Sequence, residues 1–130
     1  MQSDILTVAA IALGGAIGAV TRYLLALRAY AALGLGLPYG TLTVNLLGAL
    51  LIGIVAGLVE ERGALGPQAR AFLTIGLLGG MTTFSTFTYE TWELMRDGEA
   101  AGALVNVTVS VLGALALFAA GHYVVRLLES

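Results

Sequence analysis

The side chains best suited to handling an ion lie in one short run of the chain. Two glycines precede five hydroxyl residues and two phenylalanines, in the order Gly79-Gly80-Met81-Thr82-Thr83-Phe84-Ser85-Thr86-Phe87-Thr88. A phenyl ring has a negative face and a positive edge, so the edges of Phe84 and Phe87 could stabilise a small desolvated anion. Hydroxyl donors beside the rings, from Thr83, Thr86 and Thr88, would replace part of the lost water. Weak sites of this kind let an ion leave again, whereas a fixed cation would trap it.

The spacing of the two phenylalanines also has a plainer interpretation. Phe84 and Phe87 are three residues apart, on a helical face that would carry Gly80 as well. Such a pair is typical of core aromatics packed against a neighbouring helix. The hydroxyl residues around the pair favour the ion path over this packing role.

Other polar residues recur at helical spacing in apolar surroundings. Thr41 and Asn45 are four residues apart, as are Asn106 and Ser110, so each pair shares one helical face. Polar side chains within membrane spans are costly and serve either function or helix–helix contacts. A lone serine or threonine in a span usually bonds its own helix backbone, whereas an asparagine amide is not satisfied so easily. Thr41, Asn45 and Ser110 are therefore candidates either for an ion path or for helix–helix contacts. Arg22 is interpreted as a residue at the rim of that path or, alternatively, as an interfacial anchor.

The glycine and threonine run is also a poor helix interior. Two glycines followed by β-branched residues disfavour the helix between Gly79 and Thr83. A break at mid-membrane depth exposes backbone carbonyl and amide groups, which are tolerated only in protein, beside water or against an ion. The sequence therefore predicts that the third of four spans is broken in the middle of the membrane.

The amino-acid composition indicates a lipid environment and disfavours most enzymatic functions. The chain has 130 residues, 58% of them hydrophobic and 11% charged, and its mean hydropathy is +0.94. So few charges cannot cover a soluble domain, which indicates an all-α protein in a lipid bilayer. The chain has no cysteine, one histidine, no basic tract and a net charge of −2. These counts disfavour a disulfide framework, a nucleic-acid partner and an enzyme, since no credible catalytic base lies beside the hydroxyls.

Charged residues divide the chain into four apolar stretches, each long enough for the roughly 20 residues of a membrane-spanning helix. The whole chain is therefore interpreted as a single membrane domain, residues 1–130. The predicted spans are residues 5–27, 39–59, 71–95 and 101–127.

Pairs of glycines four residues apart recur along these spans. They are Gly14 and Gly18, Gly53 and Gly57, and Gly76 and Gly80. This spacing lets helix backbones approach closely, primarily within one bundle and, in a second interpretation, between subunits. Four short helices enclose a conduit poorly, so the size of the chain favours an oligomer.

The arginines barely favour either side of the membrane. One side would carry Arg62, Arg70 and Arg126, and the other Arg28 and Arg96, with Arg22 added if it snorkels outward. The orientation of membrane proteins follows an excess of Lys and Arg on one side, and here that excess is almost absent. A small protein with few charges explains this balance, and so does a chain that inserts both ways and pairs as an antiparallel dimer.

The positions of the acidic residues argue against proton-coupled transport. All eight, including Glu90, are placed at or near the ends of the predicted spans. A proton-coupled small multidrug-type exporter, the competing four-helix class, would need a buried carboxylate in its first helix. That exporter is therefore the alternative to a passive ion channel, and a purely structural membrane subunit is a third possibility.

Three motifs together resemble the fluoride-channel family known as Fluc or CrcB. They are Gly14-Gly15 through Gly18 to Arg22-Tyr23, then Gly40-Thr41 to Val44-Asn45 with Gly48, and Gly79-Gly80 with Thr82-Thr83-Phe84-Ser85-Thr86-Phe87. The resemblance covers essentially the whole chain. It implies a dual-topology, antiparallel homodimer with two pores, which passively exports fluoride across the inner cell membrane and lowers cytoplasmic fluoride.

The resemblance also implies roles for individual residues. Phe84 and Phe87 would line the ion path, and Asn45 and Ser110 would supply polar contacts. The backbone carbonyls of Gly79 and Thr82 would hold a structural sodium ion at the dimer centre. Asn106 stands where some members of the family have a tyrosine.

Overall fold

The computed structural model describes residues 1–129, which form helices joined by short loops. Four helical stretches are long and apolar enough to cross a membrane. The first two are α1 (Gln2–Leu33) and α2 (Tyr39–Arg62). The third comprises α3 (Pro67–Ala71), the π-helical η1 (Phe72–Leu78), α4 (Gly79–Met81) and α5 (Phe84–Arg96), and the fourth comprises α6 (Ala100–Thr108), the π-helical η2 (Val109–Gly113) and α7 (Ala114–Glu129).

Glycine and proline set the helix ends. Gly34 ends α1 with a φ of +87°, and its amide donates to the Tyr30 carbonyl. Gly63 ends α2 in the left-handed conformation, which glycine adopts without steric cost. Pro67 then begins α3 at a position where its missing N–H is not needed. The first helix therefore continues past the predicted end at residue 27, because Arg28 does not interrupt helical hydrogen bonding and Gly34 does.

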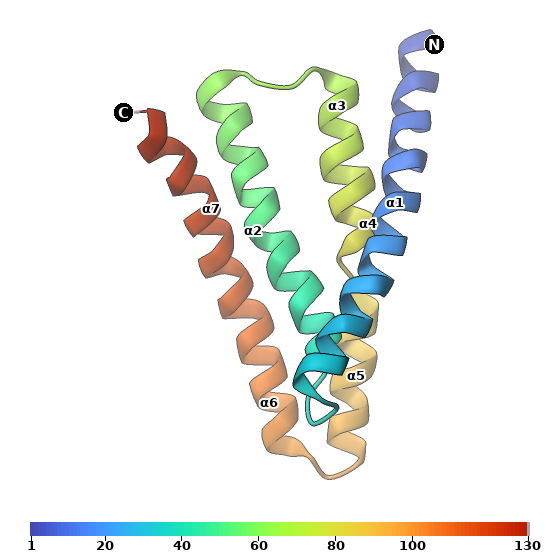
Figure 1. Ribbon diagram of the computed structural model, residues 1–130, viewed down its shortest axis with the longest axis vertical. Helices are drawn as coiled ribbons and strands as arrows, with labels where there is room; N and C mark the ends of the chain where they lie inside the picture. Colours follow the sequence, from blue (N-terminus) through green and yellow to red (C-terminus); the bar gives the residue numbers. More distant parts are fainter. Residues whose placement is uncertain (130) are drawn as a thin grey trace.

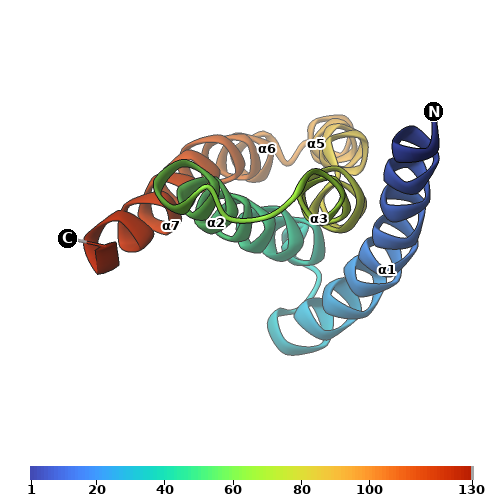
Figure 2. The same cartoon turned by 90° about the horizontal axis from the view of Figure 1, so that it is seen from above.

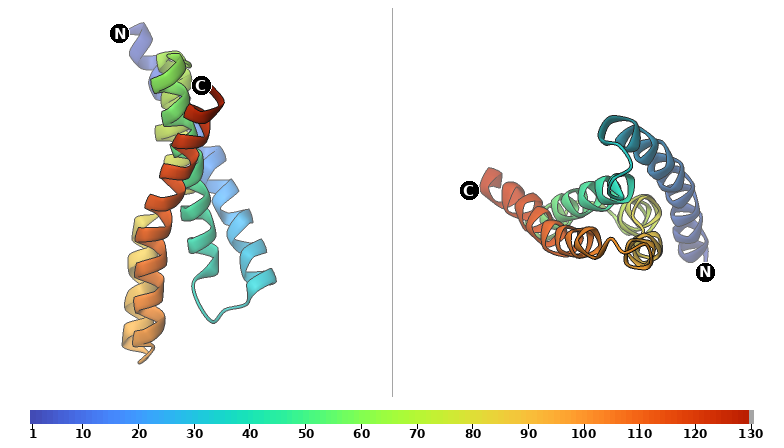
Figure 3. Two further views of the ribbon diagram at one scale, coloured as in Figure 1. Left: turned by 90° about the vertical axis from the view of Figure 1, so that its left-hand side faces the viewer. Right: turned by 90° about the horizontal axis from the view of Figure 1, so that it is seen from below.

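The helices splay apart at one end and converge at the other. Both termini and the loop between α2 and α3 lie at the splayed end, and the loops before α2 and α6 lie at the convergent end (Figure 1). Seen from above, α1 and α7 lie on opposite sides of α2 and the third span (Figure 2). The view from below shows the same order (Figure 3). Both termini therefore lie on the same side, as four crossings require.

Glycines bring the backbones of neighbouring helices into direct contact. A Cβ atom on Gly14 would lie 2.5 Å from the Phe72 carbonyl oxygen, and one on Gly18 would overlap the Leu77 carbonyl oxygen. Likewise, a Cβ atom on Gly53 of α2 would overlap the Phe118 carbonyl oxygen of α7. The predicted packing role of these glycines within one bundle is confirmed, since backbone lies directly against backbone at these positions.

Large apolar side chains cover the outside of the molecule. On α1, for example, Ile5, Val8 and Leu13 are exposed. A water-soluble monomer rarely shows so continuous an apolar surface, whereas a lipid environment favours it. The pattern agrees with a multi-pass membrane protein.

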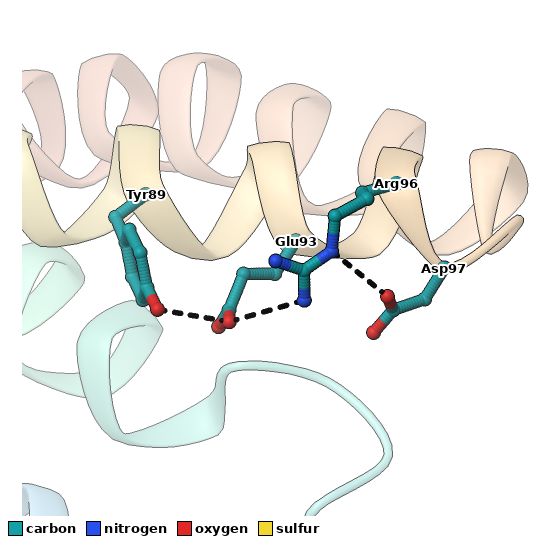
Figure 4. A network of polar contacts seen from close by, with 4 residues as sticks. All are labelled: Tyr89, Glu93, Arg96 and Asp97. Atoms are coloured by element: carbon teal, nitrogen blue, oxygen red, sulfur yellow. Dashed lines mark hydrogen bonds and ion pairs between the residues drawn. The ribbon is translucent and has the colours of Figure 1, made fainter.

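A polar network marks the end of α5. The Tyr89 hydroxyl donates to Glu93 Oε1 at 2.9 Å, and Arg96 lies 3.5 Å from the same oxygen. Arg96 Nε also donates to Asp97 Oδ1 at 3.2 Å (Figure 4). Three of these side chains are exposed and Glu93 is half-buried, so the network adds little stability. It indicates the polar end of the third span.

Candidate ion-binding groove

The third membrane-capable stretch contains two residues that are not helical. The α4 segment ends at Met81, and Thr82 and Thr83 have extended backbone with ψ angles of 157° and 118°. The α5 helix then begins at Phe84. Thr83 is its N-cap, because its hydroxyl accepts a hydrogen bond from the Thr86 amide at 3.2 Å.

Asn45 satisfies the backbone at this interruption. Its Nδ2 donates to the Thr83 carbonyl at 2.9 Å, and its Oδ1 accepts from the Thr83 amide at 2.7 Å. One side chain on α2 thus replaces the helical bond of the Thr83 amide and adds a side-chain donor to the Thr83 carbonyl, which as N-cap also faces the first amides of α5. One Nδ2 hydrogen remains for another acceptor, since an amide nitrogen carries two.

The carbonyls predicted to hold sodium have lost their usual helical donors. In a continuous helix the Gly79 carbonyl would accept from the Thr83 amide, but that amide is bound to Asn45. The Thr82 carbonyl would accept from the Thr86 amide, which is instead bound to the Thr83 hydroxyl. Both oxygens therefore lack the amide donor that a continuous helix would give them. The described residues hold no cluster of three or more His, Cys, Asp or Glu side chains suited to a metal.

A groove of about 360 Å³ lies beside the interruption, between α2, the third stretch and η2. The Phe84 and Phe87 rings line it with their centroids 5.5 Å apart and their planes at 46°. Phe84 is 78% exposed, so its ring is not a core residue of this chain. The predicted site residues that line the groove are Asn45, Gly79, Thr82, Thr83, Phe84, Phe87 and Ser110.

Four residues predicted for the ion path lie outside the groove, namely Arg22, Thr41, Thr86 and Thr88. The hydroxyl of Thr88 donates to the Phe84 carbonyl at 3.0 Å, one turn back in its own helix. Thr86 accepts from the Thr83 hydroxyl at 3.0 Å. These threonines satisfy local groups in this chain, and their contact with an ion stays a prediction.

Gly80 lies on a different face from the one that its spacing indicates. A Cβ atom on Gly80 would lie 2.7 Å from the Gly15 carbonyl of α1. The two extended residues, Thr82 and Thr83, reset the helical phase between α4 and α5. Gly80 therefore packs against α1 instead of sharing the groove face of Phe84.

Sequence reasoning missed the surroundings of Glu90. Its Oε1 accepts from the Tyr30 hydroxyl at 3.1 Å and from the Thr41 hydroxyl at 2.9 Å. Its Oε2 is buried and has no hydrogen-bond partner among the described residues. The sequence places Glu90 near the end of the third span but does not predict that α1, α2 and α5 meet around its carboxylate. The sequence offered one signal of a polar contact here, namely Thr41, which lies one turn before Asn45 on the same face of α2.

These features define a class: a small multi-span helical membrane protein with an aromatic and hydroxyl-lined groove beside an irregular stretch of its third helix. The model of the CrcB-like protein family, Camphor Resistance (CrcB), matches residues 9–122, and the chain belongs to this family.

Curated relatives from several bacteria bear the name "Fluoride-specific ion channel FluC". The protein from Geobacter metallireducens is 55% identical over 111 residues, which cover 85% of this chain and 90% of the relative. That from Citrifermentans bemidjiense is 48% identical over 118 residues, or 91% and 95% of the two chains. That from Shewanella halifaxensis is 48% identical over 103 residues, or 78% and 81%.

Proposed function

We propose that this protein is a fluoride-selective channel that lets fluoride leave the cell passively across the cell membrane. The observation that carries the proposal is the groove, where the Phe84 and Phe87 rings lie beside Asn45 and Ser110. Ring edges, an amide hydrogen and a hydroxyl are all weak donors to an anion. The name that the relatives share, fluoride-specific ion channel, supplies the identity of that anion.

The donor set suits fluoride better than chloride. Fluoride is small and strongly hydrated, so close donors must replace the water that it loses. Chloride is larger and fits a narrow path of short donors poorly. None of the described residues that line the groove carries a positive charge, so the anion is not trapped there.

Proton coupling is less well supported. The acidic residue of α1, Asp4, is exposed and pairs with the N-terminal amine at 3.1 Å. A small multidrug-type exporter would need a carboxylate buried in this helix. The structure of α1 therefore does not favour the exporter.

Cells that lack their own fluoride exporter provide the functional test. Expression of the chain should restore growth in millimolar fluoride and lower the fluoride content of the cells. Expression of the Phe87→Ile variant at the same level should neither restore growth nor lower the fluoride content. Failure of the wild-type chain, correctly inserted, to lower cellular fluoride would contradict the proposal.

We also propose an antiparallel homodimer of two oppositely inserted chains. Two observations support it: the near balance of arginines, with Arg62, Arg70 and Arg126 at one end against Arg28 and Arg96 at the other, and the exposed groove. A second chain would cover a ring that is 78% exposed and close the groove into a conduit.

Dual insertion leads to a prediction about topology. A reporter fused to the C-terminus should be found on both sides of the membrane in comparable amounts, because the arginine bias is small. Adding three lysines to the loop after Arg62 should shift the reporter to one side. The orientation of the chain without the added lysines can be mapped by labelling an introduced cysteine from each side. A single orientation would exclude the antiparallel dimer.

We further propose that the Gly79 and Thr82 carbonyls hold a sodium ion at the dimer centre. Oxygen ligands suit a hard cation, and the amides that would normally bind these two carbonyls are bound elsewhere. The ion would neutralise exposed backbone dipoles and join the two chains.

Sodium removal is then expected to weaken the assembly. Replacing sodium by a large organic cation during purification should convert dimer to monomer and reduce fluoride flux, and sodium addition should restore both. Light scattering together with flux in the two buffers makes the comparison. Full assembly and flux without sodium would rule out this site.

A further inference from the structure

The helix that bears the phenylalanines is held mainly by polar contacts. None of the side chains of α5 (Phe84–Arg96) is buried. Hydrogen bonds nevertheless join its start to Asn45 of α2, its middle to α1 and α2 through Glu90, and the next residue, Thr91, to α6. The position of α5 therefore depends on a few directed bonds, since little apolar side-chain packing fixes it.

The contact with α6 leads directly to a ring of the groove. Asn106 is 1% exposed, and its Nδ2 donates to Thr91 Oγ1 at 2.9 Å. The Thr91 hydroxyl in turn donates to the Phe87 carbonyl at 2.7 Å. A chain of two hydrogen bonds thus runs from α6 to the backbone of Phe87.

Asn106 does not share the position of Ser110, although the two are four residues apart. Ser110 lines the groove and Asn106 does not. The π-helical η2 begins at Val109, between them, and its wider turn changes the angular spacing. Asn106 consequently faces α5 while Ser110 faces the groove.

We propose that Asn106 and Thr91 are positioning residues for Phe87, and this proposal rests on the proposed fluoride-channel function. Asn106 fixes the Thr91 hydroxyl, which holds the Phe87 carbonyl and so sets the rotation and depth of that turn of α5. Because Asn106 and Ser110 belong to the same stretch of helix, the bond keeps the ring and the Ser110 hydroxyl in register across the groove. Weak donors act on a small anion only when their geometry is held closely.

The other end of the Asn106 amide supports a role in positioning over one in stability. Its Oδ1 is buried and has no hydrogen-bond partner among the described residues. A buried acceptor without a donor disfavours folding, so an apolar side chain at this position would remove that penalty. The oxygen also repels anions, which argues against direct contact between Oδ1 and the ion.

Three variants and one matched control test the proposal. Thr91→Val and Asn106→Leu remove the chain of bonds, and Thr91→Ser retains the hydroxyl. Thr7→Val is the control, because the Thr7 hydroxyl also donates to a carbonyl four residues back, that of Ser3 at 2.9 Å, on α1 and away from the groove. The readouts are fluoride efflux per assembled protein, thermal stability, and the ¹⁹F resonance of 4-fluorophenylalanine at position 87.

We expect Thr91→Val and Asn106→Leu each to lower fluoride efflux about tenfold, as small misplacements of a functional group do. Thr91→Ser should restore most of the efflux. Asn106→Leu should melt no lower than the wild type, and both bond-breaking variants should shift the ¹⁹F resonance. Thr7→Val should change neither the efflux nor the resonance.

The opposite pattern would overturn the proposal. If Thr91→Val and Asn106→Leu lower stability while efflux per assembled protein stays unchanged, the two residues only support packing. If the wild type conducts no fluoride, the proposed function fails, and the ¹⁹F resonance alone decides on positioning. An unshifted resonance in both variants then refutes it, and a shifted one supports it.

Discussion

Replacing Phe84 or Phe87 by isoleucine is expected to lower fluoride efflux by about a hundredfold, the size of effect seen when a preorganised polar donor is lost from a water-excluded site. Isoleucine has no positive ring edge, and the two rings line the groove with centroids 5.5 Å apart. Loss of either ring would leave the anion without one of its donors. Fluoride efflux at matched amounts of assembled protein measures the effect.

A packing role for the rings predicts a different result. Substitution would then cost about 1–2 kcal/mol of stability, and whatever protein folds would still conduct. Phe118→Ile serves as a matched control, because Phe118 lies on α7 outside the groove. Unchanged fluoride efflux in both Phe84→Ile and Phe87→Ile would remove the rings from the ion path.

Gly18→Val is expected to abolish folding. A Cβ atom there would overlap the Leu77 carbonyl oxygen and lie 2.9 Å from the Met81 amide nitrogen. Both are backbone atoms, so α1 would have to move away from the third stretch. Overpacking of this kind costs about 3 kcal/mol or more, a large part of the total stability of a small domain.

Gly15→Ala provides the comparison, because no described residue has an atom within 4 Å of a Cβ atom on Gly15 beyond the neighbouring backbone of α1. The yield of monodisperse protein and its melting temperature should fall sharply for Gly18→Val and little for Gly15→Ala. Equal yield and melting for Gly18→Val and the wild type would show that the close contact between α1 and the third stretch is unnecessary for folding.

The groove could largely be predicted from the sequence because its residues are unusual where they stand. Asn45 is an amide in an otherwise apolar stretch, and Phe84 and Phe87 stand among five hydroxyl residues, which is unusual for a packed aromatic pair. Local composition also indicated irregular backbone near Gly79, since glycines followed by threonines disfavour a helix. These signals are local, so no tertiary information was needed.

The partners of polar side chains could not be predicted in this way. Thr41 was assigned to the ion path from its spacing, yet its hydroxyl is bound to Glu90, which is 49 residues away in the chain. Asn106 was grouped with Ser110 for the same reason, and a π-helical turn separates their faces. Helical periodicity gives a direction only while the helix is regular, and the contacts of that face depend on how the four helices pack.

Efflux of fluoride and of chloride from liposomes tests the central claim most directly. Vesicles that hold the purified protein are loaded with potassium fluoride or potassium chloride, and a potassium ionophore starts the efflux without any proton gradient. The proposed channel predicts rapid loss of fluoride and very slow loss of chloride, with empty vesicles releasing neither. Equal rates for the two anions, or no fluoride release from vesicles with correctly assembled protein, would contradict it.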